Sequence, residues 1–182
     1  YTQDISQNAG VCVYSFICDH VLRNTGHPYR ILSKTCYDPV FSLTEEGKLS
    51  GPLRAYQDEF LNRYFNWRIF LYTGSPLYRY LCLCKLPKPY SDEHMVEVTA
   101  QLISYAKYAY QQRFNGEFYV VIWPEYPSQR LASWRTSIRN QLKARLDEMN
   151  ITYLEIPLID NPDEHILHPN DHHPNASSYQ YV

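Results

Sequence analysis

The chain has 182 residues and a formal net charge of −2, with 18 tyrosines among its aromatic residues. This length suits one ordinary globular domain. The weak charge and the lack of a basic stripe argue against a nucleic-acid-binding surface, and no apolar run is long enough to span a membrane. Tyrosine packs its ring while its hydroxyl stays hydrated, so this composition suits a half-buried core, a groove or an interface.

Five cysteines are spread along the chain in no spacing that forms a disulfide framework or a complete zinc site. They are Cys12, Cys18, Cys36, Cys82 and Cys84. We expect all of them to be reduced thiols, which favours a reducing compartment. No signal-peptide pattern precedes the first apolar segment, and the localisation stays open.

The first predicted element is a strand over residues 11–17 (VCVYSFI). Its nearly continuous run of β-branched and aromatic residues is typical of a parallel-sheet strand buried on both faces. A polar cluster that includes Asp19 and His20 follows at once. Residues 25–90 then form an insertion rich in proline and glycine, which we expect to be largely irregular.

Two features stand out inside this insertion. Short apolar segments flank Thr44–Gly47, and this pattern predicts a small β-hairpin. Residues 53–72 and 77–83 have helical character with weak periodicity.

The second half of the chain alternates helices and strands. Ser91 can cap a helix that runs to about Arg113, and residues 118–123 (FYVVIW) predict a second buried strand. The apolar stripe expected on that helix consists of Met95, Val98, Leu102, Tyr105 or Ala106, and Ala109.

A further helix, strand and helix follow. Ser128 can cap a helix whose apolar stripe consists of Leu131, Trp134, Ile138, Leu142 and Leu146. This helix ends near Asn150, a residue suited to a left-handed C-terminal cap. Residues 152–158 predict a third strand, and a last helix is expected to begin near Asn175.

This order of elements predicts an α/β fold with a parallel sheet, flavodoxin-like in its three α/β/α layers. Ligands of such sheets bind at the carboxyl ends of the strands. Three polar pairs follow predicted strand ends, so we expect them to face one crevice: Asp19–His20, Pro124–Glu125 and Asp171–His173. Three strands cover two faces poorly, so the fold is expected to lack its first strand or strands, which would precede Tyr1.

The tail segment Asp171-His172-His173-Pro174-Asn175-Ala176 carries the clearest chemical signal. A carboxylate and an imidazole lie two residues apart, on what we interpret as a short loop before a helix. Such a loop can hold a histidine against its own carboxylate, which supplies two thirds of a nucleophile-activating triad. No residue of the chain stands out as the matching nucleophile.

On these residues the chain resembles the SGNH, or GDSL-type, hydrolase family, whose last motif places an Asp and a His before the final helix, often followed by Pro-Asn-Ala. The resemblance covers residues 1–182 as one partial domain, with the insertion at about 25–90. It implies that His173 is the general base and Asp171 its orienting carboxylate. It also implies a Ser-His-Asp mechanism on a small-molecule ester or acylated substrate, without a metal or organic cofactor. An additional N-terminal segment is then needed to supply the nucleophile.

The family's third motif, G-x-N-D at a strand end, matches Phe16-Ile17-Cys18-Asp19 only at Asp19. Cys18 stands where the family has its oxyanion-hole Asn, so another donor, such as His20 or Asn24, is needed. The resemblance leaves Asp19 and His20 either as a satisfied polar pair or as substrate-positioning residues.

Two alternatives stay open. The tail residues His165, His168, Asp171, His172 and His173 invite a metal ion such as zinc or nickel, although Pro169 and Pro174 exclude their presentation on a helix. The other alternative is a non-catalytic binding or interaction protein that keeps the SGNH-like fold, which Cys18 and the many tyrosines favour.

Overall fold

The computed structural model describes residues 10–25, 39–54, 75, 77, 90–124, 132–157, 166–168 and 171–174. The chain forms two compact units. The first comprises Tyr1–Cys18 and Ile103–Val182, and the second comprises Asp19–Leu102. Each unit is described by itself.

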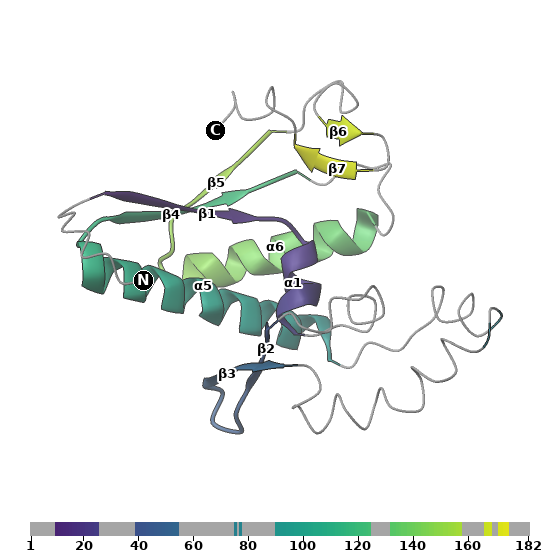
Figure 1. The fold of residues 1–182 in the computed structure, drawn as a ribbon, viewed down its shortest axis with the longest axis horizontal. Helices are drawn as coiled ribbons and strands as arrows, with labels where there is room; N and C mark the ends of the chain where they lie inside the picture. The colour runs from purple at the N-terminus through teal and green to yellow at the C-terminus, as the bar shows by residue number, and fades with distance from the viewer. Residues whose placement is uncertain are drawn as a thin grey trace. The chain divides into compact units, whose positions relative to one another are not determined.

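The first unit is built on a parallel sheet of three strands, β1 (Val11–Phe16), β4 (Glu117–Ile122) and β5 (Tyr153–Glu155). The strand order is β1-β4-β5 (Figure 1). Both pairings are parallel, so the prediction of an α/β fold with a parallel sheet is confirmed at this level. β5 is shorter than the expected 152–158.

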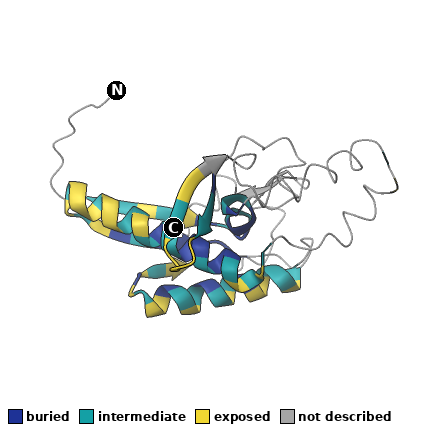
Figure 2. Ribbon diagram, turned by 90° about the horizontal axis from the view of Figure 1, so that it is seen from below, coloured by how far each residue is buried: buried dark blue, intermediate teal, exposed yellow. Residues whose placement is uncertain are grey.

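Two helices of this unit lie on the same side of the sheet, α6 (Ala132–Glu148) and the part of α5 (Asp92–Phe114) that follows Leu102 (Figure 1). Right-handed crossovers that step across a sheet in one direction put their helices on one face. The order β1-β4-β5 is such a succession. Ile138, Leu142 and Leu146 of α6 are fully buried, between exposed positions of the same helix. This part of the predicted stripe is confirmed. Figure 2 shows how buried and exposed positions alternate along the helices.

The other face of the sheet contradicts one prediction. We expected β1 to be buried on both faces, yet Val11 is 62% and Val13 is 53% exposed. Leu154 of β5 is 52% exposed. Register pairs Ser15 with Val121 and Val121 with Leu154, so these odd-numbered β1 positions and Leu154 share one face. We call it the open face. The expectation was wrong because burial of the second face depends on helices that the strand's own sequence does not specify.

The ends of the two long helices follow the predictions closely. The Ser91 hydroxyl accepts a hydrogen bond from the backbone N–H of His94 at 3.1 Å, which confirms the N-cap. Asn150 has φ 52° and forms the expected left-handed cap of α6. On α5, Met95 and Val98 are fully buried as expected. Of the two alternatives, Tyr105 is 64% exposed and Ala106 is half-buried. Ala109 is exposed, contrary to the prediction, and Ile103 is fully buried.

The second unit contains α1 (Asp19–Asn24), the hairpin strands β2 (Pro39–Leu43) and β3 (Leu49–Arg54), and the first part of α5. β2 and β3 pair antiparallel, which confirms the hairpin. Gly47 turns the chain with φ 73°, and its carbonyl accepts a hydrogen bond from Gln101 Nε2 of α5 at 2.9 Å. This bond ties the hairpin turn to the helix.

Some predictions lie partly or wholly outside the described residues. The residues Leu53 and Arg54 end strand β3 instead of beginning a helix. Most of the weak helical segments 53–72 and 77–83, the Ser128 cap and the helix near Asn175 are not among the described residues. Two further strands were not predicted, β6 (Ile166–His168) and β7 (Asp171–Pro174), and they pair antiparallel. None of the helices described is long and apolar enough to cross a bilayer.

Candidate functional site

The predicted base and its carboxylate lie in strand β7. Asp171 opposes His168 of β6, and Pro174 opposes Ile166. The expectation that Asp171–His173 form a loop was therefore wrong. Asp and Pro are poor strand formers, so the local sequence favoured a loop. The pairing with β6 overrides this preference.

A strand changes how these residues are spaced. The pairing shifts register inside this segment, because positions 166 and 168 of β6 oppose positions 174 and 171 of β7. Strict alternation of faces therefore does not hold along β7. Two strand residues span about 6.6 Å of backbone. This separation is within the reach of a carboxylate–imidazole hydrogen bond.

Asp19 and His20 form the first turn of helix α1 and are half-buried. An acidic residue is favourable at this end of a helix because the helix dipole is positive there. The two residues belong to the second unit, whereas Asp171 and His173 belong to the first. Glu125 is outside the described residues. The expected convergence on one crevice stays a prediction.

Cys18 is the second residue after strand β1 and is only 1% exposed. Its thiol donates a hydrogen bond to the carbonyl of Arg135 on α6, with Sγ and the oxygen 3.3 Å apart. The contact links the end of β1 to the helix that leads to β5. At the position that the resemblance assigns to an oxyanion-hole Asn, this chain therefore has a buried packing residue. Cys12 and Cys18 are both free thiols, as expected for these two cysteines.

A small apolar cluster lies at the carboxyl end of the sheet. Trp123, Val121 and Ile156 are buried together, with Ile17 packed against them. The indole Nε1 of Trp123 donates to the Ser15 hydroxyl at 2.7 Å. Val121 and Ser15 are register partners on the open face. Val121 is buried there, whereas Ser15 and Leu154 on either side of it are exposed. Sequence reasoning missed the Trp123–Ser15 contact because only the strand register brings the two residues together.

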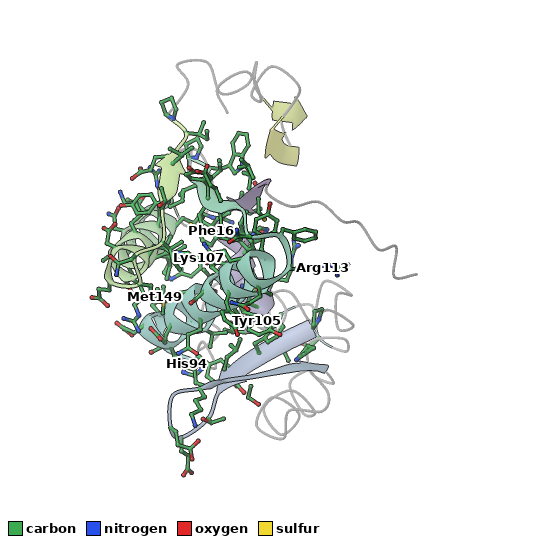
Figure 3. The ribbon with its side chains drawn as sticks, turned by 90° about the vertical axis from the view of Figure 1, so that its left-hand side faces the viewer. Phe16, His94, Tyr105, Lys107, Arg113 and Met149 are labelled. Carbon is green, nitrogen blue, oxygen red and sulfur yellow. The ribbon has the colours of Figure 1, made fainter. Side chains whose placement is uncertain are left out.

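The charged groups of α6 are engaged in structural contacts. Glu155 at the end of β5 pairs with Arg139 and with Lys143, the latter at 2.7 Å. Hydrogen bonds from Lys143 and Arg139 lower the pKa of the Glu155 carboxyl. On α5, Lys107 (labelled in Figure 3) donates to the carbonyl of Asn150 at 2.8 Å, at the C-terminal end of α6. These contacts fasten the two helices to the sheet's last strand and its preceding turn.

His94 is the other histidine with a distinctive environment. Its ring stacks on Tyr90 with centroids 4.5 Å apart. Burial lowers the pKa of its imidazole, and Nε2 is buried without a hydrogen-bond partner. The ring is therefore neutral near pH 7. It lies in the first turn of α5, in the second unit, and no sequence pattern singled it out.

Among the residues whose side chains are described, no group of three His, Cys, Asp or Glu could hold a metal ion. The histidine-rich tail is not among those residues, so the alternative of a metal site there stays untested.

Comparisons with protein-family models, with curated proteins and with solved structures found no match for this chain.

Proposed function

We propose that this chain carries the general base and the orienting carboxylate of an SGNH-type ester or acyl hydrolase with a flavodoxin-like three-layer fold. His173 is the base and Asp171 is the carboxylate. The substrate is a small ester or an acylated molecule.

One observation carries the proposal: an Asp and a His stand two residues apart on an extended strand and are followed by Pro174-Asn175-Ala176. Two residues of extended chain separate the two groups by about 6.6 Å of backbone, which is within reach of the carboxylate–imidazole hydrogen bond that a triad requires. The parallel β/α wiring that precedes them supports the same assignment, because this architecture collects ligand-binding loops at one edge of its sheet.

In the proposed mechanism, Nδ1–H of His173 donates to the Asp171 carboxylate, which fixes the tautomer and the orientation of the ring. Nε2 then accepts the proton of a serine hydroxyl as its oxygen attacks the acyl carbonyl. The same imidazolium returns the proton to the leaving alkoxide. The donor to the oxyanion is a group other than Cys18, because the Cys18 thiol is directed to the Arg135 carbonyl.

A second candidate function is binding without chemistry on the same fold. The burial of Cys18 at the oxyanion position favours it, since a hydrolase of this type needs a strong donor there. Hydrolytic activity that depends on His173 separates the two functions.

The test is ester hydrolysis by the full-length protein with p-nitrophenyl acetate as substrate. His173→Ala should lower kcat/KM by about 10³-fold or more, and Asp171→Asn should lower it by a comparable factor. His172→Ala is the matched control, because it removes the neighbouring imidazole, which has no role in the proposed mechanism, and it should change the rate less than about threefold. Equal rates for the wild type and His173→Ala would overturn the proposal.

The base–carboxylate pair can also be tested without catalysis. In an NMR titration of the histidine ring protons, Asp171→Asn should lower the pKa of His173 by about one unit, because a neighbouring carboxylate favours the imidazolium. His172→Gln should not. An unchanged pKa of His173 would mean that the two groups are not paired.

A further inference from the structure

The outer edge of β1 is the feature that the proposed function leaves unused. β1 is an end strand of the sheet, and only β4 pairs with it among the described strands. The backbone carbonyls of Gly10 and Phe16 accept bonds from Glu117 and Trp123, on the β4 side. Even-numbered residues of β1 therefore face β4, and the N–H and C=O groups of Val11, Val13 and Ser15 point outward.

Within its described residues, β1 itself has none of the sequence features that protect an end strand. Such strands are usually short, charged, bulged or interrupted by proline. β1 has six residues, VCVYSF, without a charge or a proline, and its pairing with β4 shows no register shift. The opposite edge, β5, has three residues and ends in a glutamate. Of the two end strands that the structure describes, β5 has these protective features and β1 does not.

We propose that β1 pairs with β1 of a second copy of this chain, antiparallel about a twofold axis at Val13. The outward groups are self-complementary in this arrangement, since Val13 opposes its own copy and Val11 opposes Ser15 of the partner strand. No charged side chain of β1 opposes its like across the axis. The contact closes after one pairing, and β1 becomes an inner strand of a six-stranded sheet formed by two chains of three.

The pairing also reduces the exposure of the open face. Val13 is 53% exposed and stands beside the edge. In the dimer its side chain lies next to its counterpart as a cross-strand pair, which stabilises an antiparallel contact. Val11, 62% exposed, lies next to Ser15 in the same way. The contact uses no residue of the proposed hydrolase site. A first strand supplied by a segment before Tyr1, as the proposed SGNH-type fold requires, would bind this same edge, so the two proposals predict different partners for β1.

The experiment is sedimentation-velocity ultracentrifugation of the 182-residue chain from about 1 to 200 µM, a range that covers weak edge-to-edge contacts. A concentration-dependent dimer is expected. Val13→Pro should weaken it at least tenfold, because proline removes the outward N–H while the bonds to β4 stay intact. Val13→Lys should weaken it similarly by placing two cations at the axis.

Leu154→Lys is the matched control, since Leu154 is as exposed as Val13 on the same face but lies on β5. It should leave the dimer unchanged. Far-UV circular dichroism confirms that each variant is folded. A monomer across the whole range, or a dimer weakened by Leu154→Lys and not by Val13→Pro, would overturn the proposal.

Amide hydrogen exchange locates the contact. The amides of Cys12, Tyr14 and Phe16 should be protected at every concentration, because they face β4. Those of Val11, Val13 and Ser15 should become protected only as the dimer forms. If they are already protected in the monomer, another segment covers the edge and the second copy does not bind there.

Discussion

The two faces of the β1-β4-β5 sheet have nearly the same apolar composition but different surroundings. On one face, Val120 and Ile122 are fully buried beneath the helices. On the other, Val11 and Val13 are more than half exposed. The strands supply apolar side chains to both faces alike, so the order in which the crossovers step decides which face is covered. Coverage is a property of the topology and not of the strand.

The helix-covered face should be far more sensitive to loss of side-chain volume than the open face. Leu142→Ala should lower the free energy of unfolding by about 3 kcal/mol, because Leu142 is fully buried and the change leaves a cavity. Leu154→Ala makes the same chemical change at a residue that is 52% exposed and should cost less than about 1 kcal/mol. Urea unfolding followed by circular dichroism measures both. Similar costs would mean that the open face is buried in solution.

The open face also carries one buried cluster, which Val121, Trp123 and Ile156 form at the carboxyl end of the sheet. Trp123 is 7% exposed, and its indole donates to Ser15. Trp123→Phe should cost about 1–2 kcal/mol, from the lost hydrogen bond and the smaller ring. Ser15→Ala should lower the free energy of unfolding by about 1 kcal/mol, because the indole N–H then loses its acceptor.

The double variant of these two residues isolates their hydrogen bond. Their costs should be less than additive by about 0.5–1 kcal/mol. Strict additivity would show that the Trp123–Ser15 contact contributes nothing in solution.

A smaller effect on stability is expected from the ion pairs that join α6 to Glu155 at the end of β5. Glu155 is the register partner of Ile122, and it accepts hydrogen bonds from Lys143 and Arg139. Its pKa is lowered in the folded chain, so the folded state binds fewer protons there than the unfolded state. The Glu155 carboxylate therefore stabilises the fold above the ordinary pKa of 4.5, and this stabilisation is lost as the pH falls through the lower pKa of the folded state.

The contribution of this ion pair is limited to about 1 kcal/mol or less, because the pair is solvent-accessible. Glu155→Gln should remove it at pH 7 and flatten the stability profile below pH 4.5. Unfolding curves from pH 3 to pH 7 test this. Glu148→Gln is the control, since Glu148 pairs with Arg145 within α6 alone. An equal response of both variants would show that the link between α6 and β5 has no special role.

The features that could be predicted from sequence are the local ones, and the features that could not be predicted are set by packing between elements. The helices, the strands and the parallel wiring come from local periodicity and caps, and the Ser91 and Asn150 caps were placed correctly. The exposure of Val11 could not be foreseen, because it depends on where α5 and α6 pack. Local signals also failed in the candidate site, where Asp171–Pro174 forms a strand only through its pairing with β6. The Cys18–Arg135 contact joins residues 117 positions apart, which no local pattern encodes.

The smallest expected effect is a change in the pKa of one tyrosine on each face of the sheet. Tyr119 belongs to the open face, and its hydroxyl donates to Glu117 at 3.0 Å. Tyr153 belongs to the covered face, as the register partner of Val120. The pKa of Tyr119 is raised above 10.0 first by its hydrogen bond to Glu117 and then by the charge of that carboxylate. The pKa of Tyr153 is raised first by burial and then by the charge of Asp147.

Because the causes differ, removing the neighbouring carboxylate should change the pKa values of Tyr119 and Tyr153 by different amounts. Glu117→Gln should return the pKa of Tyr119 almost to 10.0, because burial contributes least there. Asp147→Asn should lower the pKa of Tyr153 only in part, since burial remains as its largest cause. Carbon-13 NMR of tyrosine labelled at Cζ follows both titrations. If Glu117→Gln left Tyr119 raised, the ring would be buried in solution, and the open face would be covered by a group that β1, β4 and β5 do not supply.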